Sequence, residues 1–130
     1  MEIHEFDPVI YPYKLWVVVD KKPTGISDVF DEYSGNPIEF IDRDTMGLRA
    51  FAMPVTRKED PYFGVVLFFR SRKSMSFELV AHECSHAAKY LFDHIGAEIK
   101  EHEPFEYVVG WMAGCCEKVK KQKTGNGKKD

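Results

Sequence analysis

The sequence of 130 residues contains no long apolar run, no secretory leader and no internal repeat. No apolar stretch approaches the roughly 20 residues that a membrane-spanning helix requires, so a membrane protein is not expected. The N-terminus, MEIHEFDPVIYPYKL, is acidic and lacks the basic segment and apolar block of a secretory signal, which favours a cytoplasmic protein. A chain of this length suits one domain with one hydrophobic core.

Cysteine is also scarce. The three cysteines are Cys84, Cys115 and Cys116. An odd number that includes an adjacent pair is a poor disulfide framework. Since no CxxC spacing is present, we interpret these residues as buried free thiols rather than as ligands of a metal ion.

Acidic residues outnumber basic ones except at the C-terminus. The last 13 residues hold six lysines and one acid, so this segment carries +5 while the rest of the chain carries −8 of the net −3. We therefore predict a single domain over 1–117 and a basic, disordered tail over 118–130. The acidic body argues against a broad nucleic-acid interface and leaves only weak contact by the tail.

The first half of the sequence predicts strands. Residues 13–20, 48–57 and 62–70 are rich in β-branched and aromatic residues and are separated by turn clusters. The last two predict an antiparallel hairpin. Pro54, which cannot donate to a neighbouring strand, marks 48–57 as an edge.

The second half predicts two helices, and the fold class is therefore α+β, with a small antiparallel or mixed sheet packed on two main helices. Ser74 or Ser76 can cap the first helix, which runs to about His94 before Gly96. The second helix begins near Pro104, where a missing N–H costs little, and runs to about residue 120.

The first helix contains the segment HECSH, with His82 and His86 one turn apart and Glu83 beside the first histidine. A helix advances about 100° per residue, so the two imidazoles lie nearly opposite the apolar stripe and could bind one ion together. The predicted core stripe of this helix comprises Phe77, Val80, Cys84, Ala88, Leu91 and Ile95.

The second helix has its own polar face. Glu103, Tyr107, Gly110 and Gly114 lie opposite its apolar stripe. Each interior glycine costs roughly 1 kcal/mol relative to alanine, and close approach of another backbone would offset that cost. We expect the histidine face of the first helix to make this approach, which would bring Glu103 to His82 and His86. His102 and Glu106 are the alternative third ligands.

These residues resemble a known family. HECSHAA, then Gly96 and HEPFEYVVGW, are similar to segments of small phage-encoded and prophage-type metallopeptidase-like proteins, and YPYKLWVVVD and FGVVLFF fit the strands of that family. The resemblance covers most of residues 10–117. More distantly, the sequence is similar to gluzincins reduced to a minimal, zincin-like module, although the interval from His86 to Glu103 is short and no second lobe is present.

The resemblance implies a Zn²⁺ ion held by His82, His86 and Glu103. Glu83 would be the general base and zinc-bound water the nucleophile in peptide-bond hydrolysis. Tyr107 would orient Glu103 or donate to the developing oxyanion. A peptide or protein substrate could add as a strand to the edge at 48–55.

Three other functions stay open from the sequence. One is a catalytically inactive, zinc-stabilised binding module of phage origin. Another is a SprT-like, DNA-associated protease with His102 as the third ligand, which would suit the basic tail. The third is a cytosolic domain without metal, in which HECSH is a solvated polar face.

Overall fold

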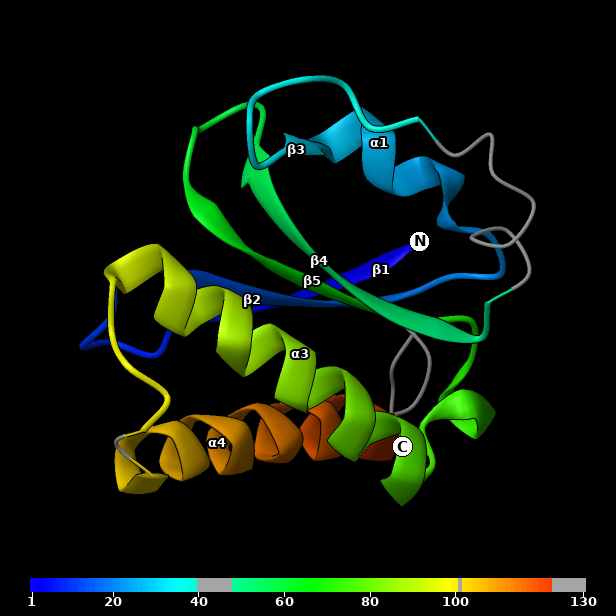
Figure 1. Cartoon of the computed structure of the whole chain (residues 1–130). Helices are drawn as coiled ribbons and strands as arrows, with labels where there is room; N and C mark the ends of the chain where they lie inside the picture. Colours follow the sequence, from blue (N-terminus) through cyan, green and yellow to red (C-terminus); the bar gives the residue numbers. More distant parts are fainter. Residues whose placement is uncertain (40–47, 101, 123–130) are drawn as a thin grey trace.

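The computed structural model describes residues 1–39, 48–100 and 102–122, and these form an α+β fold with two long helices on one face of a five-stranded sheet (Figure 1). The strand order is β1-β2-β5-β4-β3, and all neighbours are antiparallel except β2 and β5. The strands are β1 (Glu2–Phe6), β2 (Lys14–Val19), β3 (Phe30–Glu32), β4 (Ala50–Arg57) and β5 (Phe63–Phe69), and the helices are α1 (Ile26–Val29), α3 (Phe77–Ile95) and α4 (His102–Lys121).

The sheet confirms the predicted fold class and the three predicted strands. β4 and β5 form the predicted antiparallel hairpin. The strands β1 and β3 and the parallel pairing of β2 with β5 were not predicted, because β1 reads as an acidic segment and β3 is only three residues long. The parallel pair lies in the centre of the sheet, where both strands are almost completely buried.

Alternation along the central strands supplies apolar side chains to both faces of the sheet. Leu15, Val17 and Leu67 point to the face covered by α3 and α4. Trp16 and Phe68 point to the other face, where they pack in a second cluster with residues of α1, β3 and β4. The sheet is therefore buried on both faces.

Both ends of α3 follow the sequence prediction. Ser76 Oγ accepts a hydrogen bond from the Leu79 backbone N–H at 3.2 Å, which caps the first turn. At the other end, Gly96 adopts a left-handed conformation with φ 72°, which a residue with a side chain rarely adopts.

The two long helices run antiparallel. Cys84 Sγ lies 3.9 Å from Cys116 Sγ, and the rings of Phe92 and Phe105 have centroids 5.4 Å apart. This register places Phe77 level with the last turn of α4, where little of that helix remains to cover it. Phe77, predicted to be in the core, is therefore 91% exposed.

The described end of the chain is helical. α4 continues to Lys121, so it includes the first four residues of the predicted tail. Residues 123–130, for which disorder was predicted, lie outside the described residues. No helix in the described part combines the length and the apolar character needed to cross a membrane.

Arg72 joins the N-terminal strand to the helical layer. Its guanidinium donates to Glu2 through Nη1 and Nη2 at 2.9 and 2.8 Å, and Nε donates to the Val119 carbonyl of α4 at 3.0 Å. One side chain thus connects β1, the turn before α3, and the C-terminal end of α4.

Candidate metal centre

His82 and His86 lie one turn apart on α3, and both are exposed. Their Nε2 atoms are 3.2 Å apart. Two nitrogen ligands at 2.0–2.1 Å from a tetrahedral zinc ion are separated by about 3.3 Å, so the distance between the two Nε2 atoms matches that of two ligands of one zinc ion. The same separation also fits a hydrogen bond from one ring to the other.

The pair faces away from α4. α3 packs over β4 and β5, whereas α4 packs over β2, so the side of α3 opposite α4 is the side toward β4 (Figure 1). At the C-terminal end of α3, the ring of His94 contacts Phe63, which pairs with Thr56 at the end of β4. Measured along the helix axis from His94, His86 and His82 lie roughly 12 and 18 Å closer to the N-terminus of α3, which places them near the N-terminal half of β4.

Glu83 is buried although the preceding residue, His82, is exposed. Its side chain is only 7% exposed. Burial raises the pKa of the Glu83 carboxyl above its ordinary value, while the charges of His82 and His86 act in the opposite direction. The carboxyl group is therefore held against the protein, within reach of the charges of the two imidazoles.

The structure does not bring Glu103 to the histidine pair, contrary to the sequence prediction. Glu103 lies in the first turn of α4 and is exposed. The antiparallel register places it level with the end of α3, about 14 Å along the axis from His86 and further from His82. Among the described residues, no group of three His, Cys, Asp or Glu side chains could hold a metal ion.

The alternative third ligands have similar positions. Glu106 is exposed one turn later in α4. His102 begins α4, even further along the axis than Glu103, and its side chain lies outside the described part of the chain. The third ligand thus has no candidate on the described surface of α4.

The expected contact between the histidine face and the glycines of α4 is also absent. A Cβ atom built on Gly110 or Gly114 would meet no atom within 4 Å outside the neighbouring helical backbone. The helices instead meet through their apolar stripes. Tyr107 is 73% exposed and borders a shallow cavity with Pro8 and Trp111, away from the pair.

The edge of β4 beside α3 is the second feature of this region. β3 pairs only with residues Val55–Arg57, and within the described ranges no strand pairs with 50–54 on that side. The Arg57 N–H and the Arg49 carbonyl both bond on the side of β4 that faces β5. Since the backbone groups of alternate residues in a strand point to opposite sides, those of Ala50, Ala52 and Pro54 point away from β5. Pro54 therefore has its missing N–H at the edge, as predicted.

His94 has a structural environment that the sequence did not reveal. Its ring lies against Tyr13, Tyr33 and Phe63, with centroids 4.9–5.6 Å away, and Tyr33 Oη hydrogen-bonds Nδ1. Nothing in the sequence indicated this cluster, because the four residues come from separate parts of the chain.

Comparisons with models of protein families, with curated proteins and with solved structures gave no match to this chain. The zincin-like resemblance therefore stays a prediction, and the site is interpreted from its own geometry.

Proposed function

We propose that this protein is a zinc-dependent, metallopeptidase-like hydrolase, in which His82 and His86 bind zinc and Glu83 is the general base. The observation that carries the proposal is the 3.2 Å separation of the two exposed imidazole Nε2 atoms, which matches the spacing of two zinc ligands. A purely structural site would not need the carboxyl group of Glu83 beside its first ligand.

When bound, zinc would supply a Lewis acid for a peptide carbonyl and lower the pKa of water. Glu83 would accept the proton of the attacking water and deliver it to the leaving amine. The outward backbone groups of Ala50 and Ala52 would align an extended peptide by strand addition beside α3. Hydrolytic zinc sites have three protein ligands, and the third is not assigned among the described residues.

Metal binding is the first test. Chelator-treated protein is titrated with zinc against a chromophoric competitor, and bound metal is counted after desalting. We expect one zinc per chain, and we expect His82→Ala and His86→Ala each to weaken affinity by more than about 100-fold. His4→Gln changes a histidine outside the pair and is the matched control. Failure of the wild type to bind stoichiometric zinc would refute the proposal.

Hydrolysis is the second test. Zinc-loaded wild type and Glu83→Gln are incubated with a mixed peptide library, and products are identified by mass spectrometry. We expect Glu83→Gln to keep its zinc and to lose cleavage by about 10²–10⁴-fold, the usual contribution of a general base. Stoichiometric zinc without cleavage by the wild type would instead support a non-catalytic binding module.

A further inference from the structure

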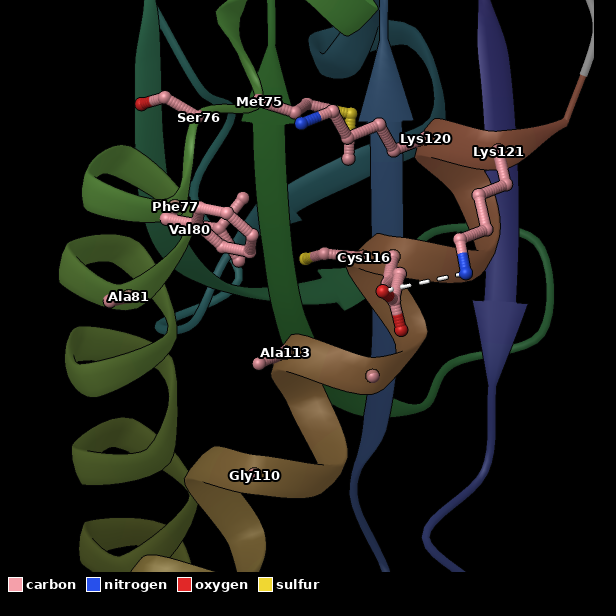
Figure 2. Close-up of a pocket in the computed structure, with 12 residues that line it drawn as sticks. Met75, Ser76, Phe77, Val80, Ala81, Gly110, Ala113, Cys116, Lys120 and Lys121 are labelled. Atoms are coloured by element: carbon pink, nitrogen blue, oxygen red, sulfur yellow. Dashed lines mark ion pairs between the residues drawn. The ribbon is translucent and has the colours of Figure 1, made fainter.

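The outer surface of the two long helices has an open apolar groove. It has a volume of about 720 Å³ and lies between the N-terminal half of α3 and the C-terminal half of α4. Phe77 and Val80 project from α3 toward α4, and Ala113 lies on the opposite wall (Figure 2). Phe77 is 91% exposed, and an exposed aromatic side chain beside an apolar groove is typical of an interaction surface.

Gly110 and Gly114 line the same groove. Each costs roughly 1 kcal/mol relative to alanine in a helix interior, and no other part of the described chain uses the space above them. The residues that the structure describes thus give no intramolecular reason for two glycines here. Glycines one turn apart permit the backbone of another helix to approach closely.

One acid and one base of α4 lie symmetrically about the glycines. Glu103 and Lys121 are separated by 18 residues, or five full turns, so both lie on the line of Gly110 and Gly114. Residue 112 is the midpoint both of Glu103 and Lys121 and of Gly110 and Gly114. Two α4 helices placed antiparallel would therefore oppose Glu103 to Lys121 at both ends and Gly110 to Gly114 in the middle.

We infer that this face binds a second copy of the same chain, with the two α4 helices antiparallel across a two-fold axis near residue 112. A two-fold interface must be self-complementary, and a face with an acid at one end and a base at the other meets this condition only when antiparallel. Lys121 also pairs with Glu117 of its own helix at 3.5 Å, but both side chains are exposed and that ion pair is weak.

The expected dimer is weak. From Glu103 to Lys121 the face is about 27 Å long, and two helix widths span about 20 Å. Each partner would bury roughly 500 Å², for a total of about 1,000 Å², which is at the lower limit for specific interfaces. We therefore expect a concentration-dependent dimer in the micromolar range. His82 and His86 lie outside the groove lining and would stay accessible, whether or not they bind zinc.

The experiment is sedimentation velocity on the full chain from about 1 µM to about 500 µM, a range that brackets a micromolar dissociation constant. We expect a monomer–dimer equilibrium in the wild type. Glu103→Lys and Lys121→Glu should each weaken it by at least about tenfold, and the double exchange should restore it, because opposite charges then face each other again. Gly110→Leu should abolish it while far-UV circular dichroism is unchanged.

Glu59→Lys in the β4–β5 turn makes the same charge change away from the face and is the matched control. A chain that stays monomeric across the range overturns the inference, even if the groove then binds an apolar dye, since the occupant would not be a second copy. A double exchange that fails to restore the dimer, or a control as disruptive as Glu103→Lys, overturns it as well.

Discussion

At the scale of single residues, Glu2 is held unusually firmly for a position so close to a chain terminus. The paired hydrogen bonds from Arg72 hold the pKa of Glu2 at about 2, well below its ordinary 4.5. The folded chain therefore binds fewer protons at this group than the unfolded chain does. The resulting stability is fully present above about pH 4.5 and is lost as pH falls toward 2.

Glu2→Gln removes this contribution. We expect the free energy of unfolding to fall by roughly 1–2 kcal/mol at pH 7, since the side chain is partly exposed and solvent screens the pair. The decline of stability between pH 4.5 and pH 2 should also become shallower than in the wild type. Urea unfolding at several pH values measures both effects. With Glu59→Gln as control, parallel pH curves for wild type and Glu2→Gln would contradict the prediction.

At the scale of elements, glycines in strand and helix have opposite roles. Gly64 of β5 lies opposite Lys14 of β2, and a Cβ atom there would collide with the Lys14 carbonyl oxygen and the Trp16 ring. The strand backbone cannot yield easily, because β2 and β5 are the central pair. We expect Gly64→Ala to lower the free energy of unfolding by about 1–3 kcal/mol in urea titrations.

Gly110→Ala is the helical counterpart. An added Cβ there would meet nothing within 4 Å, so the helix gains propensity without strain. We expect stability to rise by up to about 1 kcal/mol when measured by urea unfolding of dilute, monomeric protein. A loss of stability would show that something in the same chain already fills this space.

The elements themselves were largely predictable, and the reason is that their signals are local. Ser76 and Gly96 bound α3 as expected, because a capping side chain and a left-handed glycine act within one turn. The helix wheel also gave most of the buried face of α3, where Cys84, Ala88 and Leu91 are buried as expected and Phe77 is not. It could not give the axial register of one helix against the other, which depends on the packing of Cys84 with Cys116 and of Phe92 with Phe105.

That distinction explains why one half of the candidate site could be predicted and the other half could not. His82 and His86 belong to one helix, so their juxtaposition follows from helical geometry alone. Glu103 belongs to another helix, and its distance from them is a property of the whole molecule. The sequence shows neither the axial register of the two helices nor the orientation of the histidine pair away from α4, and both keep Glu103 from the pair.

The same register decides which apolar residues of α3 support the fold. Leu91 is fully buried and packs in the core between α3, α4 and the sheet, whereas Phe77 is 91% exposed. Leu91→Ala should cost about 2–5 kcal/mol, because it leaves a cavity that the rigid sheet cannot fill. Phe77→Ala removes a larger side chain yet should change monomer stability by less than about 0.5 kcal/mol.

Urea unfolding of both variants at low concentration compares the two losses directly. Since Phe77→Ala removes the larger apolar side chain, a smaller loss of stability for it than for Leu91→Ala reports the folded packing. A large loss for Phe77→Ala and a small one for Leu91→Ala would mean that α3 meets α4 in a different register, which would contradict the packing described above. The expected contrast would instead support the register observed, in which Phe77 is exposed on the surface of the described residues.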